Sequence, residues 1–297
     1  MLFVVLEEAC RTTQPLFVSL LVTYFTVDSD ITTQDAYMYA AIVVLLSAIA
    51  ITAHHPYFFY NSLLGMRIRV ACSGLIYRKS LRLSSIALGK TTVGQIVNIL
   101  SNDVNRFDQA LLFIPYLWIG PLQVIIVTVL LWYELGPSCF AGMSILLLMA
   151  PLQAWFGSLC SKFRAKTAIL TDERVQFMNE IISGMRVIKM YAWEKPFGHL
   201  VSESRRREIW KIRKSSLLRG TNLAFLFTTT SLVSFATFVV YSLTGNTLTS
   251  RKVYLAIPLF NVLRLLISLF LPYGIITTTE AVVSIRRIKV LGTDFNL

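Results

Sequence analysis

Charged side chains lie inside stretches of this sequence that are otherwise apolar. Glu7, Glu8 and Arg11 fall in the first such stretch, His54 lies in the second, and Arg264 interrupts the last. A charged group inside a membrane span is costly and usually faces a polar interior. An arginine there can bind a carboxylate or a phosphate through two parallel hydrogen bonds. The alternative is that Arg11 pairs with Glu7 or Glu8 along one helix.

A partial phosphate-binding motif occurs at Gly89, Lys90 and Thr91. The full motif, G-x-x-x-x-G-K-[ST], needs a further glycine where this chain has Ser84, and it follows a buried strand. The residues before Ser84 are basic and have the pattern of a helix instead. We therefore interpret these residues as a turn.

Cysteine and histidine are too sparse for a metal site or a disulfide framework. The four cysteines show neither close pairing nor the spacing of metal ligands, and there are three histidines. We expect free thiols and no bound metal. The cysteines are Cys10, Cys72, Cys139 and Cys160.

The elements that position these residues are membrane spans. Of the 297 residues, 55% are hydrophobic and 15% are charged, which excludes an ordinary soluble enzyme, a disordered chain and a disulfide scaffold. A spanning helix needs roughly 20 predominantly apolar residues. On that basis we predict an all-α, polytopic membrane protein with six spans. They cover about 2–27, 37–64, 109–133, 135–161, 220–250 and 253–279.

The positive charges orient the spans. The segments 65–106 and 161–219 hold 21 of the 28 Lys and Arg residues, so both are expected in the cytoplasm, together with both termini. The net charge of +12 is attributed to this topology and to phospholipid head groups rather than to nucleic acid, because no basic stretch is interleaved with a base-reading motif.

The two basic segments are predicted to be long helical hairpins that extend the neighbouring spans. They are too long for simple loops and contain a single proline, Pro196. In the second hairpin an apolar stripe recurs at helical spacing, formed by Met178, Ile181, Ile182 and Met185. From the pattern alone, this stripe either packs on the neighbouring hairpin or docks a partner.

Four motifs carry a resemblance to a known family. They are GMRIRVACSGLIYRKSLRL at 65–83, GQIVNILSNDVNRFDQ at 94–109, MNEIISGMRVIKMYAWEK at 178–195 and EAVVSIRRIKV at 280–290. Together they resemble the first membrane domain of an ATP-binding-cassette exporter of the multidrug-resistance-associated branch (subfamily C), and within it the short exporters of organic anions and cyclic nucleotides. The resemblance runs from about Leu6 to Lys289, and 291–297 is a divergent tail.

The resemblance implies partners and docking surfaces. In this family, coupling helices at the hairpin tips seat on nucleotide-binding domains, and the pore forms against a second six-span domain. ATP and Mg²⁺ would bind those partner domains, because this chain lacks the family's Leu-Ser-Gly-Gly-Gln signature and an apolar strand ending in Asp-Glu. The coupling residues implied are Thr92, Val93, Gly94, Gln95, Ile96, Val97, Asn98, Met178, Asn179, Glu180, Ile181, Ile182, Gly184 and Met185.

The resemblance also implies a substrate path for an amphipathic organic anion. Arg11, Arg264 and His54 are the expected anion contacts. Four residues are expected to form apolar walls, namely Phe113, Trp118, Leu265 and Leu269. The alternatives are that Arg264 pairs with another acid and that Phe113 is ordinary bundle packing.

The function predicted is therefore the membrane half-pore of an ATP-coupled exporter, with the plasma membrane as the expected location. A different class remains open, in which the chain is a truncated product without transport activity that acts at most as a regulatory membrane partner. An ion channel without ATP coupling would explain six spans. It would not explain two long basic hairpins that carry family motifs.

Overall fold

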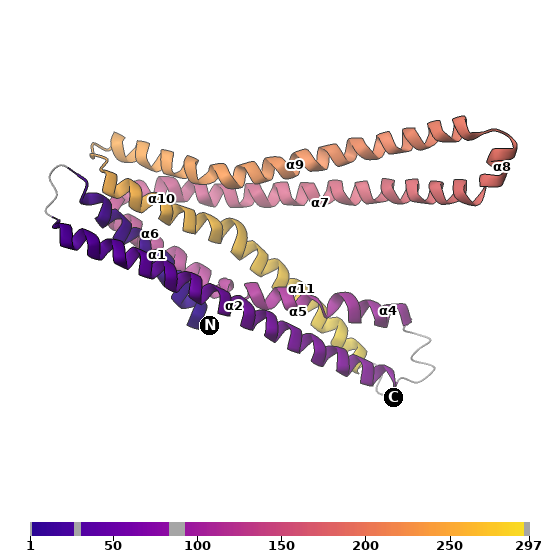
Figure 1. Cartoon of the computed structure of the whole chain (residues 1–297), viewed down its shortest axis with the longest axis horizontal. Coiled ribbons are helices and arrows are strands. Elements are labelled where there is room, and N and C mark those ends of the chain that lie inside the picture. Colours follow the sequence, from indigo (N-terminus) through magenta and orange to yellow (C-terminus); the bar gives the residue numbers. More distant parts are fainter. Residues whose placement is uncertain (1, 27–30, 83–92, 294–297) are drawn as a thin grey trace. The chain divides into compact units, whose positions relative to one another are not determined.

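All regular secondary structure in the described residues is helical. The computed structural model describes residues 2–26, 31–82 and 93–293, so the motif at 89–91 and the coupling residue Thr92 lie outside the described residues. The α-helices are α1 Leu2–Thr23, α2 Thr33–Ser80, α4 Val93–Asn98, α5 Arg106–Phe113, α6 Tyr116–Leu135, α7 Cys139–Ser183, α8 Met185–Met190, α9 Glu194–Leu243, α10 Ser250–Leu265 and α11 Leu271–Thr293. Two π-helices, η1 Ile99–Asp103 and η3 Leu266–Phe270, and one 3₁₀-helix, η2 Gly136–Ser138, adjoin them (Figure 1).

The chain forms two compact units. The first contains residues 1–144 and 233–297, and the second contains residues 145–232. The helices α7 and α9 each run from one unit into the other. The prediction that spans continue as long helical extensions is confirmed for α2, α7 and α9, which are 48, 45 and 50 residues long. The limb that leads into the third predicted span is instead divided into α4, η1, α5 and α6.

Local sequence signals fix two of the helix ends in the first unit. The Thr32 hydroxyl accepts from the Asp35 backbone N–H while the Asp35 carboxylate accepts from the Thr32 N–H, a capping box that starts α2. At the end of α6, Gly136 has φ +59°, a conformation that favours glycine, and Pro137 follows it. These residues reverse the chain between α6 and α7.

Apolar side chains hold the first unit together. Helix α1 packs against α2 and α10, and α5 packs against α2 and α11. One core cluster contains Val4, Tyr57, Tyr116, Ile119 and Leu266, and a second contains Ile76, Val104, Phe107, Ala110 and Ala281. A Cβ atom on Gly120 would lie 2.9 Å from Leu271 Cδ2, so the glycine permits the close approach of α6 to α11.

The second unit is an antiparallel pair of limbs from α7 and α9, joined by α8 at the tip (Figure 1). Glu208 is buried on α9 and accepts from Thr171 Oγ1 at 2.6 Å, Arg205 Nη1 at 2.6 Å and Arg174 Nε at 2.8 Å. These hydrogen bonds, that from Thr171 foremost, lower the pKa of the carboxyl to about 2, although its burial opposes the shift. The ionised Glu208 therefore fastens the two limbs together.

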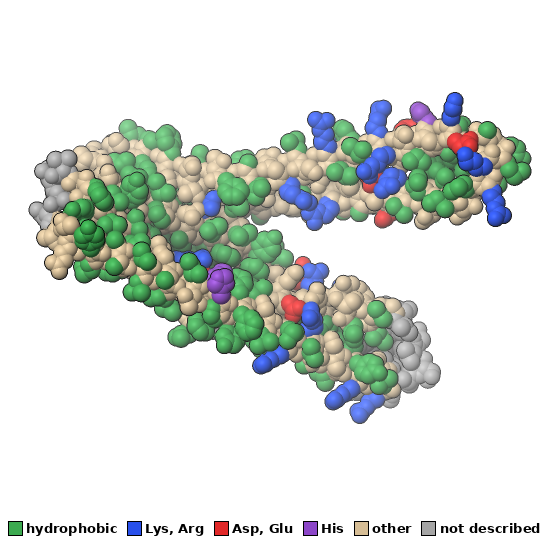
Figure 2. All heavy atoms as spheres, in the orientation of Figure 1, with side chains coloured by type: hydrophobic (Ala, Val, Ile, Leu, Met, Phe, Trp, Pro, Cys, Tyr) green, Lys and Arg blue, Asp and Glu red, His purple; other side chains and the backbone are tan. Residues whose placement is uncertain are grey.

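Four helical stretches of the described residues are long and apolar enough to cross a membrane. They are Thr33–Ser80, Ile96–Ser183, Glu194–Leu243 and Ser250–Lys289, and the second of them contains both α6 and α7. Helix α1 is not among the four, since it carries the three charges of Glu7, Glu8 and Arg11. Exposed hydrophobic side chains cover much of the visible face of the first unit, whereas cations follow the hairpin of the second (Figure 2). The limits of the six spans stay predictions.

Candidate functional site

A buried carboxylate on α1 joins two of the predicted anion contacts. Glu7 Oε1 lies 2.7 Å from Arg11 Nη2 and 2.8 Å from His54 Nδ1 on α2. Glu8 Oε1 lies 4.0 Å from Arg11 Nη1. The Arg11 side chain remains 36% exposed. Arg11 therefore makes the pairing that its helical spacing allows, and part of its guanidinium stays open to the surroundings.

Arg11 lines a cavity of about 250 Å³ between α1, α6, α10 and η3. Its walls are Glu8, Arg11, Gln123, Asn261, Val262, Leu265, Leu266 and Phe270. The lining combines polar and charged side chains with aliphatic and aromatic ones. This arrangement suits a molecule with one polar end and an apolar body.

A second cavity, of about 310 Å³, shares Arg11 with the first. It lies between α1 and α2 and brings Arg11 and His54 together. Gln14 Nε2 donates to Ser47 Oγ at 3.0 Å in its wall. Arg11 is thus the residue common to both cavities.

The two other predicted contacts on the last predicted span lie elsewhere. Arg264 is buried, at 8% exposure, in the last turn of α10, and Leu269 is half-buried on η3. Neither is among the residues that line these two cavities. Leu265 and Phe270, which are five residues apart, both line the Arg11 cavity. Backbone hydrogen bonds in a π-helix such as η3 join residues with this spacing.

Phe113 belongs to an aromatic cluster next to the Arg11 cavity. Its ring centroid lies 6.4 Å from that of Phe270 and 5.6 Å from that of Tyr273. The rings of Phe270 and Tyr116 stack at 4.6 Å. The cluster joins α5 and α6 to η3 and α11, and Phe270 links it to the cavity wall.

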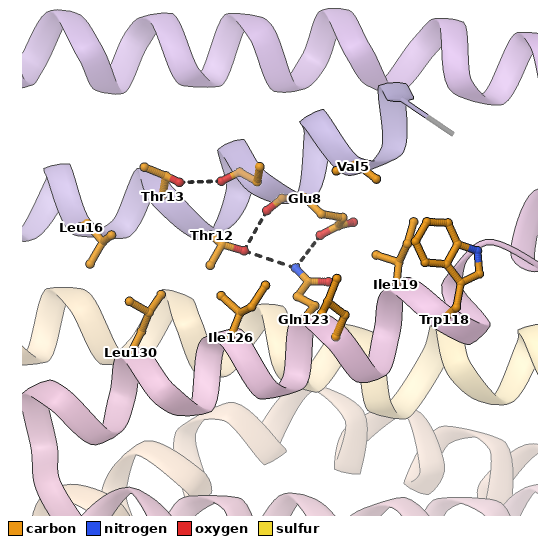
Figure 3. Close-up of a pocket in the computed structure, with 12 residues that line it drawn as sticks. Val5, Glu8, Thr12, Thr13, Leu16, Trp118, Ile119, Gln123, Ile126 and Leu130 are labelled. Atoms are coloured by element: carbon orange, nitrogen blue, oxygen red, sulfur yellow. Dashed lines mark hydrogen bonds between the residues drawn. The ribbon is translucent and has the colours of Figure 1, made fainter.

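Trp118 faces a separate groove between α1 and α6, of about 350 Å³ (Figure 3). Its side chain is 48% exposed, and most of the groove lining is apolar. At the polar centre of the groove, Gln123 Nε2 donates to Glu8 Oε2 at 2.7 Å (Figure 3). Since Glu8 and Gln123 also line the Arg11 cavity, this hydrogen-bonded pair lies between the two spaces.

Sequence reasoning did not select Gln123, Asn261 or Phe270 as site residues. An available signal was the presence of amides at Gln123 and Asn261 inside apolar stretches, because polar side chains there usually face a polar interior. No comparable signal marks Phe270, whose position depends on the π-helix.

The implied coupling residues of the first hairpin lie on α4. Val93, Gly94, Gln95, Ile96, Val97 and Asn98 form this helix. Val97 is exposed, while Ile96 packs against the cluster of Ile76 and Phe107. An apolar side chain is therefore available to a partner on one side of α4, and another anchors the helix.

The implied coupling residues of the second hairpin are divided between two helices. Five of them, Met178, Asn179, Glu180, Ile181 and Ile182, lie in the last turns of α7. Gly184 lies between the helices, and Met185 begins α8. Met178 and Ile181 are half-buried, whereas Ile182 and Met185 are exposed.

The tip carries further exposed apolar residues next to these coupling residues. Met190 is 81% exposed, and the rings of Tyr191 and Trp193 stack at 5.0 Å beside it. Between them Ala192 has φ +53°, which turns the chain from α8 toward α9. We name Met185, Val187, Met190, Tyr191 and Trp193 the tip patch. In the described residues, no group of three or more His, Cys, Asp or Glu is placed to hold a metal ion.

A family model described as the ABC transporter transmembrane region matches residues 1–267. The chain belongs to this family. It is an ABC transporter membrane domain, all-helical and polytopic, with the six-span exporter architecture and long helical extensions that were predicted.

Individual relatives place this ABC transporter membrane domain near the multidrug-resistance-associated branch. It is 48% identical over 292 residues to human ATP-binding cassette sub-family C member 4 and 50% identical over 291 residues to the mouse protein. It is 37% identical over 285 residues to the Drosophila melanogaster probable multidrug resistance-associated protein lethal(2)03659. These alignments cover 97%, 97% and 96% of this chain, which spans only 22%, 22% and 21% of the relatives.

Proposed function

We propose that this membrane domain supplies one half of the pore of an ATP-coupled exporter of amphipathic organic anions. The observation that carries the proposal is the position of Arg11. Its side chain is 36% exposed, it lines two cavities, and it lies on a helix of an ABC transporter membrane domain.

Arg11 would bind the anionic end of the substrate. A guanidinium in a partly desolvated cavity attracts a carboxylate or phosphate more strongly than it does in water. Glu7 already holds Arg11 at 2.7 Å, so the substrate anion has to compete with that carboxylate. In the first cavity Leu265, Leu266 and Phe270 would contact the apolar body.

His54 supports the same role from a second helix. His54 lines the second cavity with Arg11 and shares the Glu7 carboxylate, so it would add positive charge when protonated. Arg264, which is buried in the last turn of α10, would be a further contact for the anion. Leu269, on η3, would be a further apolar contact. Phe113 and Trp118 would form outer apolar walls.

ATP and Mg²⁺ would act on partner nucleotide-binding domains. The docking surfaces would be α4 with Thr92 on one hairpin and, on the other, the residues from Met178 to Met185 together with the tip patch. Closure of the partner domains on ATP would push on these surfaces and move the cavity from inward-facing to outward-facing. A second six-span domain would complete the pore in the plasma membrane, and both termini would face the cytoplasm.

Binding of a fluorescent amphipathic anion tests the proposal on this chain itself. Dansyl undecanoate would be titrated into the full chain in nanodiscs, with Arg11→Ala and Arg264→Ala as test variants. Arg251→Ala is the matched control, because Arg251 also pairs with a glutamate, Glu134, at 3.2 Å. We expect saturable binding that Arg11→Ala weakens about tenfold or more and that Arg251→Ala leaves unchanged. Equal binding by the wild type and Arg11→Ala would remove Arg11 from the site.

A further inference from the structure

The base of the α7–α9 hairpin carries a dense group of cations without any acid. The stretches 157–170 and 209–222 contain no Asp or Glu. We name their cationic residues the basic collar: Lys162, Arg164, Lys166, Lys211, Arg213, Lys214 and Arg219. All are exposed except Lys211, which is half-buried.

The two parts of the collar lie side by side. Cys160 Sγ is 3.9 Å from Ser215 Oγ, and the rings of Phe156 and Phe225 are 5.4 Å apart. Since the limbs are antiparallel, these contacts set the collar cations of α7 opposite those of α9. The result is a local concentration of positive charge on one short length of the hairpin.

Several other cations of the inner segments are paired with acids. In the first unit Arg69 contacts Asp108 at 2.8 Å, and Arg106 contacts Glu280 at 2.6 Å. Farther along the second hairpin, Arg174 and Arg205 share Glu208. Within the described residues, no ion pair with an acid neutralises a collar cation. The collar is therefore available to anions from outside the chain.

The collar lies where the predicted spans meet the cytoplasm. The fourth predicted span ends at Ser161, and the fifth begins at Gly220. Lys211 is the collar cation farthest from a span end, and it lies about 14 Å along the helix from Gly220. This is little more than the Debye length of about 8–10 Å at physiological salt, so the collar lies within the field of a charged membrane surface.

Exposed apolar side chains accompany these cations. Trp210 is 51% exposed, and Lys214 Nζ lies 3.7 Å from the centroid of its ring. Leu217 and Ile169 are also exposed. Aromatic residues with lysine and arginine are typical of the membrane–water interface, where the ring contacts the lipid and the cation contacts the head group.

We propose that the basic collar binds the head groups of anionic phospholipids in the cytoplasmic leaflet. The cations are spread along two helices rather than converging on one point, which suits several lipid phosphates and carboxylates. The accompanying exposed Trp210 and Leu217 favour a lipid over a soluble anion. This inference depends on the predicted limits of the spans and not on the exported substrate.

Native mass spectrometry of the full chain in detergent tests this proposal. Phosphatidylserine and phosphatidylcholine would be added in competition, and bound lipid counted. The test variant is Lys211→Gln/Arg213→Gln/Lys214→Gln. The control, Arg186→Gln/Lys195→Gln/Arg206→Gln, removes the same charge nearer the tip of the same hairpin.

We expect the wild type and the control to prefer phosphatidylserine, and the collar variant to lose about tenfold of that preference. Equal preference in all three proteins would overturn the proposal. If the collar variant does not fold, the wild-type protein alone tests the proposal. Its preference for phosphatidylserine must fall when salt is raised from about 0.1 M to about 1 M, and an unchanged preference would overturn the proposal. Displacement of phosphatidylserine by an equal concentration of soluble glycerophosphoserine would also contradict a lipid site.

Discussion

Glu7→Gln isolates the competition between the protein's own carboxylate and a substrate anion. The substitution keeps the size of the side chain and its capacity to accept hydrogen bonds from Arg11 and His54, but it removes the negative charge. We expect it to tighten anion binding, because the Arg11 guanidinium is then no longer neutralised by Glu7.

The magnitude follows from the geometry around Arg11. An anion that contacts the guanidinium on the side away from Glu7 would lie about 6 Å from that carboxylate, and at an effective dielectric constant of about 20 their repulsion is about 3 kcal/mol. Solvent at the partly exposed Arg11 reduces this value. We therefore expect an affinity gain of about tenfold, which is about 1.4 kcal/mol.

Titration of dansyl undecanoate into nanodisc-embedded protein measures this gain. Glu134→Gln is the matched control, since Glu134 pairs with Arg251 on other helices. A folded Glu7→Gln protein that binds the anion no more tightly than the wild type would refute the reasoning, and weaker binding would show that Glu7 positions Arg11 instead of competing for it.

Three further predictions concern the fold and the docking surface. Gly142→Ala should destabilise the chain by about 1–3 kcal/mol in thermal unfolding, because the new Cβ would lie 2.3 Å from Thr237 Oγ1, whereas Gly157→Ala, with open space around it, should not. Glu208, with a pKa lowered from 4.5 to about 2, should stabilise the hairpin by about 3 kcal/mol above pH 4.5. Hydrogen exchange should show this stability falling as the pH drops toward 2. The Glu208→Gln substitution should abolish that pH dependence. Trp193→Ala should lower substrate-stimulated ATPase activity in an assembled transporter without changing anion binding, and equal stimulation would exclude the tip patch from docking.

Hydrophobic patterning was sufficient to predict the long helices. The apolar run that starts at Tyr37 and the basic limb after it form one helix, α2, which continues through Pro56. The ion pairs along α1 also follow from the sequence, since Glu7 and Arg11 are four residues apart on one helix.

Contacts between distant segments could not be predicted in this way. The hydrogen bond from Gln123 to Glu8 joins residues 115 positions apart, and no local pattern specifies it. The π-helix that contains Phe270 is likewise not specified by a local pattern, so Phe270 was not among the expected wall residues. At the hairpin tip, the positive φ of Ala192 brings Tyr191 and Trp193 together, and periodicity does not predict such a turn.

Transport by a chimera tests the central claim most directly. This chain would replace the matching segment of human ATP-binding cassette sub-family C member 4, to which it is 48% identical, and ATP-dependent uptake of an anionic conjugate would be measured in inside-out vesicles. The half-pore account predicts ATP-dependent uptake by the chimera and a marked loss of uptake with Arg11→Ala at equal surface expression. A chimera that reaches the surface but transports nothing, or one whose uptake is indifferent to Arg11→Ala, would contradict it.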